Sequence, residues 1–375
     1  SIHFNKIILV TEKNFLDSIT PRVTVLMSVY NGSKYLSDAV DSILTQTYTN
    51  FEFLIIDDMS IDNSFEILKS YKDDRIRLIK NEKNIGMSAS LNKGLNLALG
   101  KYIARMDQDD ISLPNRLEKQ IEYFKEHNDI CVLGSWFKVI SGDDPYQIKK
   151  EYRWPDDPET CAFLLYFFGD SPIGHPCVMF KKNEIKRLGG YNVKYQIAND
   201  LELWLKVLLS HKRICNVPIC LFYWREHDTN TSNTVLTIRE HNNALSQFLS
   251  VLIGESISNK KSRLYRPINW MQNYQINNRM VYETLKMKME VLKTFTNEYE
   301  PNINTAFKFS IDIWESLQKF YRLNIFGLIH FTFIASIFCI RFILRIKNYF
   351  QILTKFILYI YPSIFKKVAR KIRYT

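Results

Sequence analysis

Apolar, β-branched stretches alternate with amphipathic segments over the first hundred residues of the chain. Short runs of Val, Ile, Leu and Phe predict strands, and apolar residues spaced by three or four positions predict helices. Strands are expected at residues 23–29, 51–56, 76–79 and 101–104, and helices at residues 36–44, 64–71 and 89–99. Alternating strands and helices are typical of a parallel sheet in an α/β fold, where ligands bind beyond the carboxyl ends of the strands.

Polar side chains directly follow three of the four predicted strands. In strand order they are Tyr30 and Asn31, then Asp57 and Asp58, then Asp107, Asp109 and Asp110. The carboxyl ends of parallel strands lie at one edge of a sheet. These side chains are therefore expected to converge on a single site.

Three carboxylates occupy the four positions from Asp107 to Asp110. Carboxylates this close repel one another, and their pKa values rise unless a cation neutralises them. A hard divalent ion suits such a cluster, because Mg²⁺ is usually held by one or two carboxylates together with substrate phosphates. The alternative is an acidic turn that opens a helix, with Asp110 or Ser112 as the N-cap residue before Pro114.

Several short motifs resemble the nucleotide-binding half of the family 2 glycosyltransferases. In chain order they are residues 25–32 (VLMSVYNG), 42–48 (SILTQTY), 56–60 (IDDMS), 84–86 (NIG), 100–103 (GKYI), 107–110 (DQDD) and 114–117 (PNRL). The resemblance extends over residues 21–232. It implies a GT-A fold (a Rossmann-like, mostly parallel sheet flanked by helices), a nucleotide-sugar donor, a divalent Mn²⁺ or Mg²⁺ cofactor and inversion at the anomeric carbon.

The resemblance also implies roles on the donor side of the site. The nucleotide-sugar-binding residues would be Tyr30, Asn31, Asp58, Asn84, Asp107 and Arg225. Tyr30 would pack on the base and Asp58 would read its edge, while the Arg225 guanidinium suits bidentate contact with a phosphate. Asp109 and His227 would be the metal ligands. Alternatives remain open: Tyr30 as a core aromatic, Asp58 as the cap of the next helix, and His227 as an ordinary loop residue.

On the acceptor side, the resemblance assigns Asp200 as the general base. Members of the family usually carry Glu-Asp where this chain has Asn199-Asp200, so the first acid is missing. Its loss puts the orientation of the acceptor in doubt, but not the type of reaction. His175 and Trp204 are expected to line the acceptor side. The alternative for Asn199 and Asp200 is that they open a helix, which is compatible with catalysis because a carboxylate at a helix start stays ionised.

Composition adds information about the compartment and the C-terminal tail. Six cysteines show no repeated spacing and no C-x-x-C pair, which indicates thiols in a reducing compartment. Residues 1–20 lack a basic region followed by a long apolar core, so no secretory signal is expected. The net charge is +11; eleven Lys and Arg residues follow Ser316, and no Asp or Glu follows Glu315.

The C-terminal tail is apolar as well as basic. Residues 325–340 have only three polar side chains, but a stretch of this length is shorter than the about 20 residues needed to span a bilayer. Residues 341–357 place their polar side chains on one helical stripe. Basic amphipathic helices of this kind lie in the interface of an anionic membrane. The alternatives are a packed helical subdomain or an oligomer interface; the density of Ile, Leu and Phe argues against nucleic acid.

These observations predict four segments: an N-terminal extension (1–20), a GT-A domain (21–234), a helical accessory region (235–317) and a membrane-associating helical tail (318–375). The predicted activity moves a sugar from a nucleoside diphosphate, with a UDP-sugar favoured, to a glycan or lipid-linked glycan. The expected location is peripheral, on the cytoplasmic face of a membrane. There are two alternatives. A non-catalytic scaffold protein that binds a nucleotide-sugar would have no need for Asp109 and Asp200, which are both present. A nucleotidyltransferase of related fold would have no need for the segment that contains Asp200 and Trp204.

Overall fold

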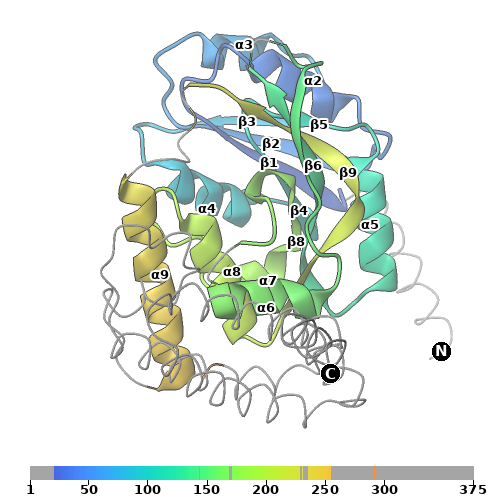
Figure 1. The fold of residues 1–375 in the computed structure, drawn as a ribbon. Helices are drawn as coiled ribbons and strands as arrows, with labels where there is room; N and C mark the ends of the chain where they lie inside the picture. Colours follow the sequence, from blue (N-terminus) through green and yellow to red (C-terminus); the bar gives the residue numbers. More distant parts are fainter. Residues whose placement is uncertain are drawn as a thin grey trace, which may run out of the picture. The chain divides into compact units, whose positions relative to one another are not determined.

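The computed structural model describes residues 21–142, 144–168, 171–228, 230, 235–254 and 291 (Figure 1). The chain divides into two units, and almost all described residues belong to the first, residues 1–165 and 169–262. The predicted extension, the predicted tail and most of the predicted accessory region lie outside the described residues. Among the helices described, none is both long and apolar enough to cross a membrane.

The described residues form one nine-stranded sheet with the order β3-β2-β1-β4-β8-β6-β9-β5, and β7 pairs with β6. The strands are β1 (Val23–Val29), β2 (Phe51–Asp57), β3 (Ile76–Lys80), β4 (Tyr102–Met106), β5 (Ile111–Ser112), β6 (Ile130–Ser141), β7 (Ile148–Tyr152), β8 (Met179–Lys181) and β9 (Arg213–Glu226). The first four strands pair in parallel, as predicted. β8 is antiparallel to both β4 and β6, so the second half of the sheet is mixed.

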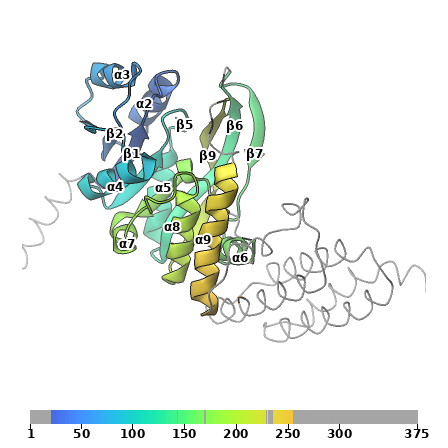
Figure 2. The same ribbon diagram turned by 90° about the vertical axis from the view of Figure 1, so that its left-hand side faces the viewer.

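The helices of the described residues are α2 (Leu36–Leu44), α3 (Ser64–Ser70), α4 (Met87–Leu97), α5 (Arg116–Glu126), α6 (Pro158–Phe168), α7 (Lys182–Arg187), α8 (Asn199–Leu209) and α9 (Val235–Ile253), with a 3₁₀ turn η1 (His175–Cys177). The predicted helices at 36–44 and 64–71 match α2 and α3 within a residue. The helix expected at 89–99 is α4, which begins and ends two residues earlier. α8 and α9 lie side by side (Figures 1 and 2).

Close packing of α4 on the sheet depends on a single glycine. A Cβ atom at Gly94 would lie 2.2 Å from Leu26 Cδ1 on β1, so a larger residue would push the helix away. The helix follows Gly86, whose φ of 85° lies in the left-handed region that glycine tolerates. These two glycines fix where α4 begins and how closely it approaches the strands that carry the site.

The acidic run lies in the turn that joins β4 to β5, two strands that pair with different neighbours in the sheet. β4 ends at Met106, and β5 is fixed by antiparallel pairing of Ile111 with Tyr223 on β9. The following helix, α5, has Asn115 at its N-cap position without a side-chain cap. The alternative in which Asp110 or Ser112 caps a helix is therefore wrong, and the acidic turn belongs to the sheet edge.

Candidate active site

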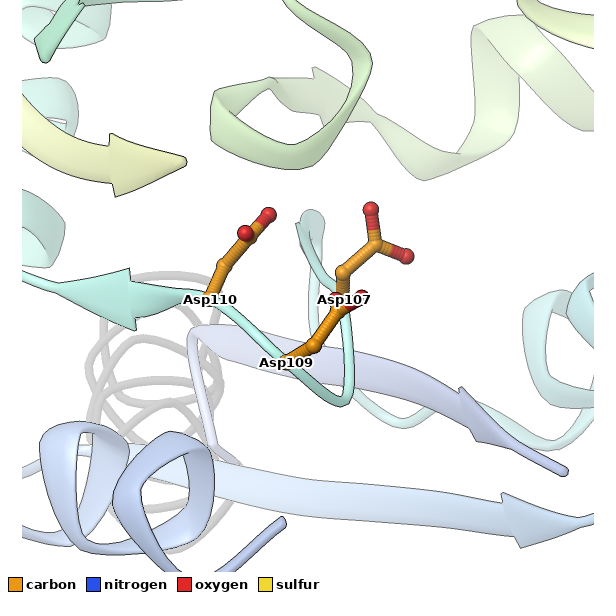
Figure 3. A group of neighbouring side chains, drawn as sticks. All are labelled: Asp107, Asp109 and Asp110. Atoms are coloured by element: carbon orange, nitrogen blue, oxygen red, sulfur yellow. The ribbon is translucent and has the colours of Figure 1, made fainter. Parts of the chain in front are cut away.

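The three carboxylates of the turn converge on one point. Each of Asp107, Asp109 and Asp110 offers an oxygen, and these atoms all lie within 4.8 Å of one another (Figure 3). Burial, followed by the charge of Asp107, raises the pKa of Asp109. Burial, followed by the charges of Asp109 and Asp107, raises the pKa of Asp110 well above its ordinary value. The turn thus brings three carboxylates together, of which Asp110 is buried and the other two are partly buried.

The donor set fits a divalent cation. Asp110 Oδ2 is buried and has no hydrogen-bond partner among the described residues, and a buried orphan of this kind requires an explanation. His227 Nε2 lies 2.9 Å from Asp109 Oδ2, so the imidazole and a carboxylate of the cluster face each other. Carboxylate oxygens are the ordinary ligands of Mg²⁺ and Mn²⁺, and an imidazole nitrogen is an ordinary ligand of transition metals. The structure therefore brings the two predicted metal ligands together.

Arg225 was expected to contact a phosphate, but the structure places its side chain in the protein interior, against the acidic turn. Its side chain is 1% exposed, and its guanidinium donates to the carbonyl oxygen of Asp109 at 2.8 Å, to Gly142 O at 3.3 Å and to Asp38 at 2.8 Å. Its backbone N–H donates to Asp110 Oδ1 at 2.8 Å. Arg225 thus holds the acidic turn from the protein side, and all three nitrogens of its guanidinium donate to protein oxygens.

Arg105 is a site residue that the sequence reasoning missed. It lies on β4, two residues before the acidic run, and its side chain is almost fully buried. It forms an ion pair with Asp107. A buried guanidinium beside a carboxylate is kept only where charge pairing offsets its desolvation. The available signal was an Arg inside an otherwise apolar strand.

The loop after β1 is tied to both neighbouring strand ends. Tyr30 N–H donates to Gln108 Oε1 at 2.8 Å, and Gln108 returns a bond to Tyr30 O at 3.2 Å. Asn31 N–H donates to Ser60 Oγ at 3.1 Å, and the Asn31 side chain accepts from the N–H of Ile61 at 2.9 Å. The Tyr30 side chain is 45% exposed, so the alternative of a core aromatic is wrong.

Asp58 accepts hydrogen bonds from the backbone of the loop before α4. It is 1% exposed and accepts hydrogen bonds from Asn81 Nδ2 at 2.7 Å, Ile85 N at 2.9 Å and Gly86 N at 2.8 Å. α3 has its N-cap position at Asn63, so Asp58 does not cap that helix. Asn84 lies exposed in the loop that Asp58 holds. To contact the edge of a nucleobase, the Asp58 carboxylate would use the acceptor capacity that these three hydrogen bonds leave free.

Asp200 lies in the first turn of α8, which begins at Asn199 as the helix alternative expected. Its Oδ1 accepts the N–H of Leu201 at 2.7 Å. Burial is the main cause that raises its pKa; Arg105 lowers the pKa in part, and Asp107 raises it. The Asp200 carboxylate is thus close enough to the acidic turn to sense its charges.

His175 and Trp204 form a second layer beside Asp200. His175 Nε2 lies 3.0 Å from the Tyr191 hydroxyl, and its ring lies 6.1 Å from that of Trp204 in an edge-on arrangement. Burial, reinforced by the Arg105 charge, lowers the pKa of His175 well below its ordinary value, so the imidazole is neutral. Trp204 is fully buried and therefore supports His175 from the core instead of facing an acceptor. Tyr191 was not predicted.

A pocket of about 410 Å³ adjoins His227. It is lined by Lys34, Tyr35, Ser141, Gly142, Lys149, Glu226, His227 and Asp228. The Tyr35 ring stacks under the Arg225 guanidinium at 4.6 Å and lies 5.1 Å from the His227 ring. The pocket therefore has one wall in common with the metal-ligand pair.

The sheet order, the acidic turn and the helix bearing Asp200 define a protein of the GT-A class. One of its matches among solved structures is S. aureus TarS, residues 1–349 in complex with UDP-GlcNAc. The TM-score is 0.53 at 14% sequence identity, over 76% of this chain and 83% of that chain. Identity this low supports the fold alone. The predicted GT-A fold is confirmed.

Sequence comparison identifies the family. Residues 24–189 match the model of glycosyl transferase family 2. The chain is 33% identical over 256 residues to the O-antigen biosynthesis glycosyltransferase WbnJ of Escherichia coli, which covers 66% of this chain and 95% of WbnJ. It is 36% identical over 200 residues to the UDP-Gal:alpha-D-GlcNAc-diphosphoundecaprenol beta-1,3-galactosyltransferase of Escherichia coli, covering 51% of this chain and 69% of that protein. This chain belongs to glycosyltransferase family 2 and is a glycosyltransferase, as the resemblance predicted.

Proposed function

We propose that this glycosyltransferase is metal-dependent and inverting, and that it moves a sugar from a nucleoside diphosphate to a hydroxyl of a glycan or lipid-linked glycan. The observation that carries the proposal is the pairing of Asp109 with His227 at 2.9 Å, inside a carboxylate cluster whose charge acts on Asp200. A divalent cation held by these residues would stabilise the charge of the departing diphosphate, and Asp200 would be the base for the attacking hydroxyl.

A divalent cation, Mn²⁺ or Mg²⁺, would neutralise the diphosphate as it leaves. Asp109, Asp110 and His227 are the residues that would hold it, since Asp110 Oδ2 is buried without a partner among the described residues. Asp107 is engaged by Arg105, which favours a role toward the ribose or a metal-bound water. Arg225 fixes the turn through the carbonyl oxygen of Asp109 and the N–H bond to Asp110.

The proposed transfer is a single displacement. The acceptor oxygen forms a bond to the anomeric carbon while the bond from that carbon to the diphosphate oxygen breaks, so the configuration inverts. The hydroxyl proton passes to Asp200 Oδ2, because Oδ1 already accepts the Leu201 N–H at 2.7 Å. The diphosphate leaves with the electron pair of the broken bond.

The choice of donor and acceptor draws on the relatives. One of them is named for transfer from UDP-Gal to a GlcNAc-diphosphoundecaprenol, and another for O-antigen biosynthesis. We therefore propose a UDP-sugar donor and a lipid-linked glycan acceptor. The eleven cations of the tail after Ser316 would hold the protein on an anionic membrane surface, where such an acceptor is found.

The test measures release of nucleoside diphosphate by the full chain from a panel of UDP- and GDP-sugars, with and without a GlcNAc-diphosphate-lipid acceptor. We expect release that depends on acceptor, on UDP-sugar and on Mn²⁺ or Mg²⁺. Chelator should stop it. Transfer at an undiminished rate in chelator would contradict the metal dependence, and a preference for a nucleoside triphosphate would point to nucleotidyl transfer.

A further inference from the structure

A buried carboxylate from α9 lies at the start of α8. Glu240 is 6% exposed, although it belongs to a helix outside the segment that matches the family model. Its oxygens accept the N–H of Gln196 at 3.0 Å each, and Oε2 also accepts the N–H groups of Ile197 at 2.8 Å and Ala198 at 3.0 Å. Three consecutive backbone donors thus converge on one side chain.

These bonds anchor the segment that leads into α8, since Ala198 is the N-cap residue of the helix and Gln196 and Ile197 precede it. The backbone N–H groups at a helix start lack partners within the helix and need side chains, water or ligands. α8 begins at Asn199, and its N-cap residue Ala198 has no side chain able to accept. Glu240 therefore satisfies the N–H of the N-cap residue from another helix and fixes the two residues before it, and its negative charge is well placed at the positive end of the helix dipole.

The capped segment is also tied to α4. Asn199 is 1% exposed, and its Nδ2 donates to Ser88 Oγ at 2.9 Å, while the Ser88 hydroxyl donates to Tyr195 O at 2.9 Å. The segment 195–199 is thus held from α4 on one side and from α9 on the other. The next residue along the chain is Asp200.

We propose that Glu240 is a positioning residue for Asp200, and that α9 is consequently part of the catalytic unit instead of an accessory region. The inference rests on the proposed role of Asp200 as the base. Glu240 does not touch the acceptor; it fixes the backbone from which the Asp200 carboxylate projects. Misplacement of a reacting group by about 1 Å can cost about 10²-fold in rate.

The test compares Glu240→Ala and Glu240→Gln with Leu249→Ala in the full chain. Leu249 is a fully buried residue further along α9, so its truncation loosens the helix without touching the cap. We expect Glu240→Ala to lower kcat for transfer by about 10- to 100-fold, with the donor KM within about twofold. The Gln variant should lose less, because its one carbonyl oxygen can still accept. Leu249→Ala should lower the melting temperature at least as much, yet keep kcat within about twofold.

Two further measurements separate positioning from general destabilisation. Amide hydrogen exchange at residues 196–198 should accelerate in Glu240→Ala and stay slow in Leu249→Ala. In an Asp200→Asn background, Glu240→Ala should cause no further loss of kcat, because residues that act through one another are not additive. Unchanged exchange at residues 196–198, or a full additional loss in the double variant, would overturn the inference.

Failure of the inference and failure of the proposed function give different results. If Asp200→Asn transfers at the wild-type rate, the base assignment fails, and with it the reason for Glu240 to matter to kcat. If Asp200→Asn loses transfer while Glu240→Ala, with the same folded fraction, keeps it, only the positioning role of Glu240 fails.

Discussion

Replacing Asp200 by Asn tests the proposed base while disturbing the fold little. Asn has the same size, and its carbonyl oxygen can still accept the N–H of Leu201, a bond of 2.7 Å in the native chain. The segment that leads into α8 does not depend on Asp200, because the N–H groups of residues 196–198 are bonded to Glu240. The free energy of unfolding should therefore change little, and a loss of transfer can be assigned to chemistry.

The expected loss follows from the atoms that remain available. With Oδ1 occupied by Leu201, Oδ2 is the atom that takes the proton, and Asn presents an NH₂ group there instead. General base catalysis contributes about 10²–10⁴-fold, or about 3–5 kcal/mol of barrier. We expect kcat to fall within that range. The donor KM should stay close to the wild-type value, because the base acts after the donor is bound.

The pH dependence of kcat provides a second readout. Burial is the main cause of the raised pKa of Asp200, and Arg105 only partly opposes it. The base works only when ionised, so kcat should rise with pH through a pKa above the ordinary carboxyl value. In Asp200→Asn the residual rate should lose this acid limb.

Glu202→Gln is the matched control for Asp200→Asn. Glu202 lies two positions further along α8, but it accepts from Asn192 Nδ2 at 3.2 Å and pairs with Lys206 at 3.3 Å, so it is already engaged. We expect this control to retain transfer within a few-fold of the wild-type rate. Normal transfer by Asp200→Asn, or an acid limb that persists in it, would refute the assignment; a large loss in Glu202→Gln instead would move the base to that residue.

Three further predictions concern the acidic turn and the tail. Asp109→Asn should reduce transfer by orders of magnitude and abolish the rise in melting temperature that Mn²⁺ causes in the wild type; a normal rise would remove Asp109 from the ligand set. The raised pKa of Asp110 means that the folded chain binds more protons than the unfolded chain. In chelator, stability should therefore fall as pH rises from about 4 through that raised pKa, as thermal melts can measure; a flat profile would contradict it. The full chain should sediment with anionic vesicles better than with neutral ones, and deletion after Leu317 should remove this preference; equal sedimentation would exclude the interfacial tail.

The first half of the fold was predictable because its signals are local. Short, largely apolar runs such as residues 51–56 favour strands because they are too short for helices, and the amphipathic segments between them favour helices. The parallel order then placed Tyr30, Asp58 and Asp109 at one edge of the sheet without further information. The mixed second half was not predicted, because β8 is only three residues long and its pairing with β4 depends on contacts far apart in sequence.

The supporting residues of the site could not be found from the sequence. Arg225 and Glu240 each contact residues that are more than forty positions away in the chain. A basic residue near the end of a family motif fits a phosphate contact as well as a structural one, and only its burial distinguishes the two. Trp204 has apolar helical spacing that is compatible with the core, and the structure places it there.

The charges around the acidic turn support the proposed divalent ion. Three carboxylates face the site, and among the described residues the ion pair of Arg105 is with Asp107. The Arg225 charge is directed to Asp38, since its other side-chain bonds go to carbonyl oxygens. Asp109 and Asp110 are left with two formal charges in a buried turn, and both have raised pKa values. An ion of charge +2 beside His227 would balance them, so binding it should release protons at pH values near or below the raised pKa values, and the number released should decrease as pH rises above them.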